Sequence, residues 1–474
     1  MRYFVGVYLC VFDYFVTFAA VTIRITKGKM KKVRTIKRLL LTVSAVMVAM
    51  VSVAQTPELG IVKCTDCGTF WRYDFNYATT DVDGETPVTL SGAIFMSSAV
   101  HEGRAEAKGC GLVNHYTITS NAERPTNVTD FTTLEGFVSN SNYLLIESDG
   151  YGFGLDSLRN QKYLQGRATA RINIDAFIAG RKLIEQEGFS HGNVTLNLGY
   201  SQGGHSGMWV NRLVAEGYRS DELPKIDYSL LGGGPYDMYS HYQSLLSADK
   251  TQYPVALPLI LSGMIDAGGY KVKQEDVFAD EVVKVLPELF DSKLYSTDSI
   301  NAFFYKNFGG SKDEGLEMSK IVKEAFFNPE SEPMTDIVYH LKENSLVYDS
   351  WTPAKTDTMT FVHSPVDEVV PYINMESMEN YLKSVGYNSF DIFNEREEKH
   401  TDMGVLYAFK VMVSLDPYVP TGMEERFRNT PGECLHDIYS IDGRLIHRNA
   451  KMSEVYPTLP KGIYVVKGRK VVKR

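Results

Sequence analysis

The chain has 474 residues, of which 44% are hydrophobic, 12% aromatic and 23% charged. This composition excludes a disordered chain, and the length allows one large core with an addition, since single cores stop growing near roughly 250–300 residues. The formal net charge is −9, but residues 1–54 hold nine Lys and Arg against one Asp, a net +8, so the rest carries −17. Such an acidic body argues against nucleic acid as a partner.

Residues 30–54 have the organisation of a secretory signal peptide. A basic segment precedes an apolar one, and small residues end it. We therefore predict cleavage after Ala54 and an exported protein, which is periplasmic, at the cell surface or extracellular. Residues 1–29 precede this complete signal, so we interpret them as an upstream mis-start, with Met30 as the true start. The alternative is a membrane span over 3–23.

Four cysteines follow the predicted cleavage site: Cys64, Cys67, Cys110 and Cys434. An exported chain can oxidise them, and the sequence leaves open whether they form a structural disulfide or none. Cys64 and Cys67 make a C-x-x-C pair without the βαβ context of a redox motif, and no second pair or nearby paired histidines complete a zinc site. We expect no metal and no cofactor.

The elements up to the middle of the chain alternate between strands and helices. Residues 68–100 alternate apolar and polar side chains around a turn at Asp83-Gly84, which predicts antiparallel strands. Further predicted elements are buried strands at 111–115, 143–147 and 228–231 and a helix at 168–185. Together they predict a mostly parallel sheet covered by helices on both faces.

The stretch 193–210, NVTLNLGYSQGGHSGMWV, reads as a strand, a tight turn and a helix. Its turn contains the pattern G-x-S-x-G, with Ser201 at the centre. A serine in a strained strand-to-helix turn needs neighbours without a Cβ, and it projects over the sheet edge beside the free N–H groups of the helix. The flanking elements favour a nucleophile at Ser201 over the alternative, a plain glycine-rich turn.

The second half of the chain changes character twice. Residues 236–350 break the alternation and are mostly helical in pattern. The predicted helices in this region are at 254–265, 276–290, 300–307, 318–327 and 334–343. Strands at 359–364 and 389–393 then resume the alternation, and a helix at 402–413 follows.

The strand, turn and helix at 193–210, within this order of elements, resemble the nucleophile elbow of the α/β-hydrolases, and we call this segment the elbow. The resemblance implies that fold, with residues 236–350 as a helical cap; extra helices packed on the outside are the alternative. It also implies a triad in the chain order Ser, acid, His. A serine hydroxyl needs a histidine base. Among the histidines after Ser201, His400 follows a strand in a charged loop before a helix, where the family has its base.

The acid implied by the resemblance is Asp367. The stretch 363–372, HSPVDEVVPY, resembles the acid loop G-x-x-D-x-x-V-P of the family, with His363 or Ser364 in place of the first glycine. We read His363 itself as part of a buried strand. We expect the neighbouring Glu368 to face solvent.

The oxyanion hole implied by the resemblance has two backbone N–H groups. The first is that of Gln202, directly after the serine. The second follows the strand 111–115 and comes from Tyr116 or Thr117, in a segment that lacks the H-G-G run of many esterases.

The segment 148–154, SDGYGFG, and Gly199–Gly204 are similar to bacterial and fungal secretory lipases, a likeness that covers most of 75–415. It implies a secreted serine hydrolase that cleaves carboxylic esters, either small molecules or lipids, through an acyl-enzyme. Prolyl oligopeptidase-like peptidases share the elbow and the acid loop, so a peptidase is the alternative. A non-catalytic surface binding protein on the same scaffold is a further one.

Residues 417–433 read as a Pro- and Gly-containing linker, and 434–474 as short strands only. The stretches 438–444, IYSIDGR, and 459–466, LPKGIYVV, resemble the C-terminal sorting domain of the type IX secretion system. The resemblance implies the secretion machinery as a partner; a small β-domain that only packs on the hydrolase is the alternative. Residues 55–416 are then expected to fold as one hydrolase domain.

Overall fold

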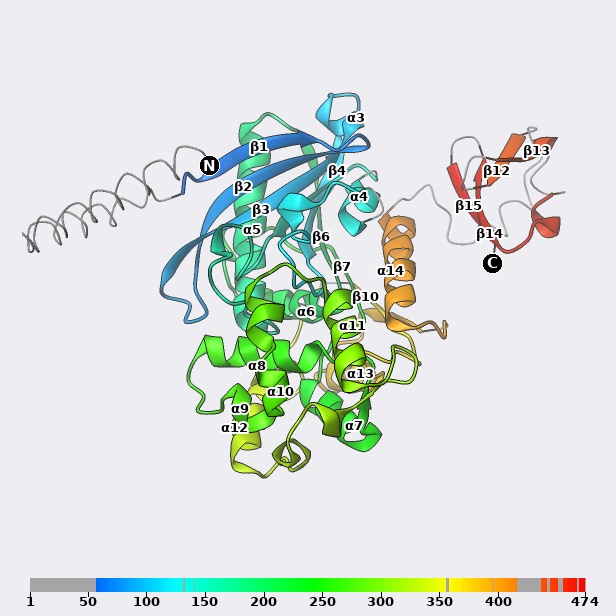
Figure 1. The fold of residues 1–474 in the computed structure, drawn as a ribbon. Helices are drawn as coiled ribbons and strands as arrows, with labels where there is room; N and C mark the ends of the chain where they lie inside the picture. The colour runs from blue at the N-terminus through cyan, green and yellow to red at the C-terminus, as the bar shows by residue number, and fades with distance from the viewer. Residues whose placement is uncertain are drawn as a thin grey trace, which may run out of the picture. The chain divides into compact units, whose positions relative to one another are not determined.

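The computed structural model describes most of the chain from residue 57 onward (Figure 1). The described residues are 57–130, 133–139, 141–354, 358–394, 396–415, 436–440, 444–450, 455–466 and 469–473. The predicted signal peptide, the segment before it and the predicted linker lie outside these residues.

A nine-stranded sheet forms the centre of the main body. Its strands are β1 (Gly60–Asp66), β2 (Phe70–Thr80), β3 (Pro87–Ser97), β4 (Ala107–Asn114), β5 (Tyr143–Ser148), β6 (His191–Tyr200), β7 (Tyr228–Gly232), β10 (Met359–Val362) and β11 (Phe390–Phe393). They are ordered β1-β2-β3-β5-β4-β6-β7-β10-β11, with β1 to β3 antiparallel at one edge and the strands from β5 onward parallel. The predicted mostly parallel sheet is confirmed, and β1 is an additional strand that the sequence pattern did not predict.

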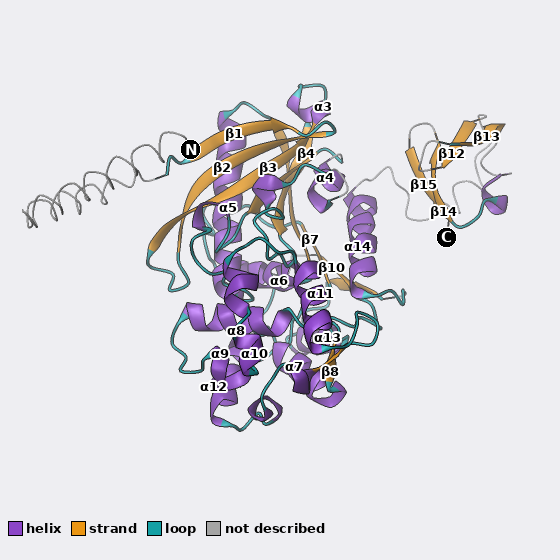
Figure 2. Ribbon diagram, in the orientation of Figure 1, coloured by secondary structure: helices purple, strands orange, loops and turns teal. Residues whose placement is uncertain are grey.

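Helices cover both faces of this sheet (Figure 2). They are α4 (Leu134–Ser139), α5 (Gly166–Gln186), α6 (Gln202–Ala215), α13 (Ile373–Ser384) and α14 (His400–Leu415), with a short α3 (Ser98–His101) after β3. On β5, Leu144 and Ile146 join the core beneath α5 and α6, whereas Tyr143 and Leu145 join the core beneath α4 and α14. This division follows from the alternation of side chains along a strand.

The region 236–350 forms a helical cap with an apolar core of its own. Its elements are α7 (Met238–Ala248), β8 (Lys250–Thr251), α8 (Ala256–Ala267), α9 (Gln274–Val277), α10 (Asp280–Val283), α11 (Thr297–Phe308), β9 (Leu316–Glu317) and α12 (Glu332–Glu343). Figure 1 shows these helices, in green to yellow-green, gathered at one end of the sheet. The cap therefore packs around its own cluster of apolar side chains. Some of these side chains line the cavity described below.

Two helices that we predicted in the cap are wrong. Residues 276–290 are divided between α9, α10 and a π-helical turn that begins at Pro287, and 318–327 contains only 3₁₀ turns. The backbone of Phe278 forms an antiparallel bridge with that of Val322. Residues paired in such a bridge cannot belong to a continuous helix, so both segments are interrupted. Proline lacks the N–H that a continuous helix needs. Tertiary pairing therefore overrides the helical pattern of both stretches.

The cysteines that the structure describes carry free thiols, namely Cys64, Cys67 and Cys110. Cys64 is exposed on β1, and Cys110 is buried in β4. The C-x-x-C pair of Cys64 and Cys67 is thus not bridged here, so the described part of the chain supports neither a disulfide nor a redox pair at this position.

The C-terminal residues form a separate four-stranded antiparallel sheet, ordered β13-β12-β14-β15. Its strands are β12 (His436–Ser440), β13 (Leu445–Ala450), β14 (Gly462–Val466) and β15 (Arg469–Lys473). Ile438 is fully buried in it. The predicted small all-β module is confirmed as a fold, and its role in sorting stays a prediction.

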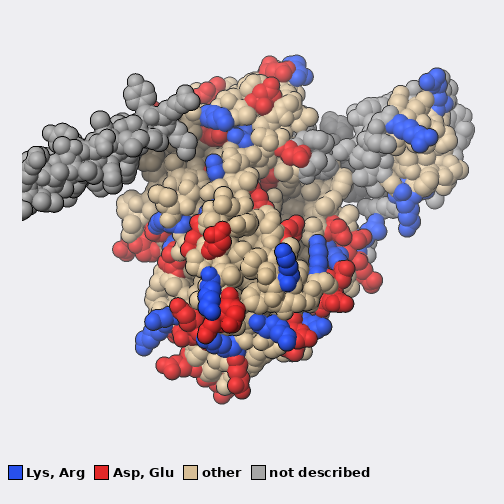
Figure 3. All heavy atoms as spheres, in the orientation of Figure 1, with Lys and Arg blue, Asp and Glu red and all other residues tan. Residues whose placement is uncertain are grey.

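Acidic and basic side chains are interspersed over the face that Figure 3 shows. Within the described residues, none of the helices has the length and apolar character needed to span a bilayer. The alternative span at 3–23 lies outside these residues.

Candidate active site

The turn between β6 and α6 holds Ser201 in an unusual backbone conformation. Its φ is 60° and its ψ is −122°, a region that non-glycine residues rarely occupy and that stores strain. The N–H of Ser201 donates to the carbonyl of Gly232 at 2.8 Å, and its own carbonyl accepts the N–H of His205 at 3.2 Å. These bonds tie the turn to β7 and to the first turn of α6, so the strained conformation is well supported.

Two glycines allow this turn to sit tightly on the sheet. A Cβ on Gly199 would lie 2.2 Å from the carbonyl oxygen of Gly203. A Cβ on Gly203 would lie 2.0 Å from the carbonyl oxygen of Asn114 at the end of β4. No side chain fits at either position, which is the physical reason for the G-x-S-x-G pattern.

His400 lies within hydrogen-bonding distance of both Ser201 and Asp367. Its Nε2 is 2.9 Å from Oγ of Ser201, and its Nδ1 is 2.7 Å from Oδ2 of Asp367. When the Nδ1–H donates to the carboxylate, Nε2 is left to accept the serine hydroxyl proton. The sequence reading put His400 in a loop before a helix, whereas it is the first residue of α14.

Asp367 is buried and held by backbone donors. Its Oδ1 accepts the N–H groups of Val369 at 3.0 Å and Val370 at 2.7 Å. Burial by itself would raise the pKa of Asp367, but the His400 ring and the backbone donors outweigh it, so the pKa is lowered. The carboxylate therefore stays ionised beside His400.

Two residues near Asp367 differ from their sequence reading. Glu368 does not simply face solvent: it is half-buried, and its Oε2 accepts the backbone N–H of His400 at 2.9 Å. His363 lies just after β10 rather than inside a strand, with Nε2 2.9 Å from the carbonyl oxygen of Val370 and 3.7 Å from Oδ2 of Asp367. Burial lowers the pKa of His363, which keeps it neutral.

The predicted oxyanion residues lie in two different surroundings. Gln202 is the first residue of α6 and lines the cavity described below. Thr117 is buried, and its hydroxyl lies 3.0 Å from the Tyr163 hydroxyl, whereas Tyr116 is 37% exposed. The carbonyls of Asn114 and His115 approach the backbone of Gly203, so the segment after β4 starts beside the elbow. The two N–H donors stay a prediction.

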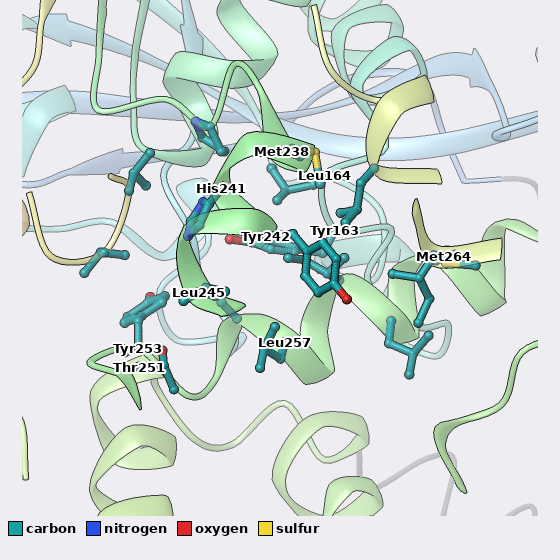
Figure 4. Close-up of a pocket in the computed structure, with 18 of the residues that line it drawn as sticks. Tyr163, Leu164, Met238, His241, Tyr242, Leu245, Thr251, Tyr253, Leu257 and Met264 are labelled. Atoms are coloured by element: carbon teal, nitrogen blue, oxygen red, sulfur yellow. Dashed lines mark hydrogen bonds between the residues drawn. The ribbon is translucent and has the colours of Figure 1, made fainter. Parts of the chain in front are cut away.

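A cavity of about 990 Å³, which includes space open to solvent, extends from Ser201 into the cap. Figure 4 shows Met238 of α7 and Leu257 and Met264 of α8 around this space, together with Tyr163, which precedes α5. Its other walls are also mostly apolar: Leu164, Pro235, Tyr242, Leu245, Tyr253, Ala256, Ile260, Leu261, Val277, Phe278, Phe326, Ile337, Leu341, Val369 and Val370. The remaining lining residues are Gln202, His241 and Thr251.

Two other histidines of the main body, His205 and His340, have structural surroundings. His205 lies with Nε2 2.7 Å from the carbonyl oxygen of Asn344. His340 is a buried residue of α12, with Nδ1 3.2 Å from the Tyr270 hydroxyl. Burial lowers the pKa of both side chains to about 4. In the described part of the chain, the side chain of neither His205 nor His340 is hydrogen-bonded to the hydroxyl of Ser201.

No protein-family model matches the sequence, and no curated protein matches it. Solved structures do resemble it. A rice cell wall degrading esterase, LipA, from Xanthomonas oryzae has a TM-score of 0.60 and 20% identity, covering 79% of this chain and 93% of the esterase. Candida antarctica lipase A in its closed state has a TM-score of 0.53 and 16% identity, covering 76% of this chain and 83% of the lipase. The protein therefore has the α/β-hydrolase fold.

Proposed function

We propose that this protein is a serine hydrolase of carboxylic esters, with Ser201 as nucleophile, His400 as base and Asp367 as the residue that orients His400. Oγ of Ser201 attacks the ester carbonyl while Nε2 of His400 takes its proton. The tetrahedral oxyanion is bound by the N–H of Gln202 and a second N–H at Tyr116 or Thr117. His400 then returns the proton to the leaving alcohol, and water releases the acid from the acyl-enzyme by the same steps.

The observation that carries this proposal is the unbroken chain of hydrogen bonds from Ser201 through His400 to Asp367 at the wall of an apolar cavity. Each contact is short enough for proton transfer. The depressed pKa of Asp367 supports its role as a carboxylate that stabilises the imidazolium. The chemistry that such a chain supports is acyl transfer through a covalent serine intermediate.

The cavity supports esters with an apolar acyl chain as the substrate class. Hydrophobic pockets gain affinity with each methylene that they bury. The names of two structural neighbours, an esterase and a lipase, point to ester hydrolysis on the same fold. A peptidase with a site for a free amino terminus gains no support, because none of the residues that line the described cavity is acidic.

The test is covalent labelling with a fluorophosphonate probe, followed by rates on p-nitrophenyl esters of rising chain length. Ser201→Ala is expected to abolish labelling and hydrolysis, and Asp367→Asn to lower kcat by about 10⁴-fold. Ser206→Ala, one turn further along α6, is the matched control and should label normally. Labelling that persists in Ser201→Ala would contradict the proposed nucleophile.

Export is the second part of the proposal. Residues 30–54 supply the signal for the first membrane, and the module at 434–474 directs later sorting. The role of the module is tested with a shortened chain that ends at Leu415. Cell fractionation compares it with the full chain, and we expect the shortened enzyme to stay in the periplasm. Unchanged secretion of the shortened chain would exclude a sorting role.

A further inference from the structure

Three side chains that could bind a cation converge beside the end of β4. They are His115, which directly follows β4, Glu135 on α4 and Glu147 on β5. One atom from each side chain lies within 4.8 Å of the other two. The proposed catalytic steps use none of the three.

The fold explains why residues so distant in sequence come together. Strands β4 and β5 are parallel neighbours, and Val113 is paired with Glu147. Glu147 is two residues beyond Leu145, so it faces the same side of the sheet, which α4 covers. Glu135 on α4 therefore approaches Glu147 from above the sheet, and His115 approaches from the end of β4.

The carboxylates of Glu135 and Glu147 are buried without partners. Each residue is 1% exposed, and all four carboxylate oxygens lack a hydrogen-bond partner among the described residues. Leaving even one buried polar group unpaired costs about 1–3 kcal/mol, and a buried unpaired charge costs more. A carboxylate oxygen of Glu135 lies within 4.8 Å of one of Glu147, so two buried acids without partners share one space.

The orientation of His115 leaves a nitrogen available in the same space. Its Nδ1 lies 2.7 Å from the carbonyl oxygen of Tyr116, so Nδ1 carries the proton and donates it. Nε2 then has a free lone pair, and it is buried without a partner in the described structure. This arrangement, with one ring nitrogen bound to a carbonyl and the other buried without a partner, is typical of histidines that bind metal.

We propose that His115, Glu135 and Glu147 form a structural site for a divalent transition-metal ion, with Zn²⁺ as the cation that best suits the donors. An imidazole nitrogen with carboxylate oxygens is a common zinc ligand set, whereas Ca²⁺ prefers six to eight oxygen ligands. Tetrahedral ligands about 2.1 Å from zinc are roughly 3.4 Å apart, so small rotations would bring these three side chains to tetrahedral spacing, and a water molecule would take the fourth position. The two positive charges balance the two carboxylates.

A cation at this site would fix the position of the segment that follows β4. The carbonyl of His115 lies against Gly203. A Cβ on Gly203 would be only 3.1 Å from this carbonyl oxygen. A cation bound by His115 would anchor the segment that carries Tyr116 and Thr117 to α4 and β5. This consequence rests on the proposed function, since that segment supplies the second oxyanion donor, whereas metal binding itself does not.

The test measures metal in the mature full-length protein, independently of activity. The protein is stripped with EDTA, titrated with Zn²⁺, Mn²⁺ and Ca²⁺ by calorimetry, and then assayed for bound metal by mass spectrometry. We expect about one Zn²⁺ per chain, a higher Tm with Zn²⁺, and weaker binding of Ca²⁺. Glu147→Gln should weaken Zn²⁺ binding about 100-fold or more.

Two further variants serve as the control and the substitute in this test. Glu123→Gln is the matched control, because the Glu123 carboxylate already accepts the N–H groups of Thr119 and Ser120, and it should bind Zn²⁺ like the wild type. His115→Gln serves if Glu147→Gln does not fold. Wild-type protein that binds no Zn²⁺, or a Glu147→Gln variant that binds it equally well, would overturn the site and show a pair of neutral buried acids instead. Neither result would bear on Ser201 chemistry, which the labelling experiment decides.

Discussion

The backbone N–H of His400 donates a hydrogen bond to Oε2 of Glu368 at 2.9 Å, while the His400 ring is bound to Asp367, the residue before it. Two consecutive acidic residues thus hold one histidine, one through the ring and the other through the backbone. Because His400 begins α14, the Glu368 carboxylate also occupies the positive end of a helix. This contact makes Glu368 a positioning residue for the proposed base.

Removing the Glu368 carboxylate should misplace His400 without removing it. We expect Glu368→Ala to lower kcat about tenfold with little change in KM, since a lost charged hydrogen bond costs roughly 1.5–3 kcal/mol and the substrate cavity is unaltered. Glu368→Gln keeps an acceptor oxygen and should recover most of the rate. Glu376→Ala, an exposed acid on α13, is the control. An equal loss in the Ala and Gln variants would contradict a positioning role.

The strained backbone of Ser201 gives a prediction about stability. Glycine adopts a positive φ without strain, so Ser201→Gly should be more stable than Ser201→Ala by about 1 kcal/mol. Urea unfolding at neutral pH measures the difference. At Ser206, inside α6, the order should reverse, because glycine destabilises a helix interior relative to alanine by roughly 1 kcal/mol. If the alanine variant were the more stable one at both positions, the backbone of Ser201 would not be strained.

The cavity predicts a chain-length preference that a bulky side chain should remove. Leu257→Trp narrows the space shown in Figure 4. We expect activity on long-chain p-nitrophenyl esters to fall about tenfold or more, while activity on the acetate stays near wild type. Leu158→Trp is the control, because Leu158 is fully exposed. A uniform loss on all chain lengths would indicate damage to the site rather than a shortened acyl pocket.

Buried histidines predict a loss of stability in acid. Burial lowers the pKa of His205 to about 4, against an ordinary value of about 6.5. Between these values the unfolded chain binds a proton that the folded chain does not, so stability is full above about pH 6.5 and falls as the pH drops toward 4, by on the order of 3 kcal/mol for this residue.

The His205→Gln variant removes this titration and can still donate to the Asn344 carbonyl. It should therefore lose less stability than the wild type between pH 7.5 and pH 4.5, as measured by urea unfolding at several pH values. His101→Gln is the comparison variant, because His101 is only partly buried. Parallel curves for the wild type and His205→Gln would show that His205 is already protonated in the folded state.

The sequence by itself determined the mostly parallel sheet, the cap region and the elbow at Ser201. The signals for them are local: apolar alternation predicts strands, helical spacing predicts helices, and glycines around a serine indicate a turn that no larger residue can occupy. Asp367 and His400 were predicted through the family resemblance to a fixed chain order. Local pattern failed at 276–290, where the bridge between Phe278 and Val322 prevents a continuous helix.

Only the tertiary structure decided which distant side chains meet. The contact of Glu368 with the backbone of His400 joins the loop after β10 to the start of α14, and no spacing in the sequence records it. The convergence of His115, Glu135 and Glu147 likewise depends on the pairing of β4 with β5 and on the packing of α4. The lining of the cavity depends on the directions of cap side chains. Side-chain direction and strand order are properties of the packed chain, because they follow from long-range burial rather than from neighbouring residues.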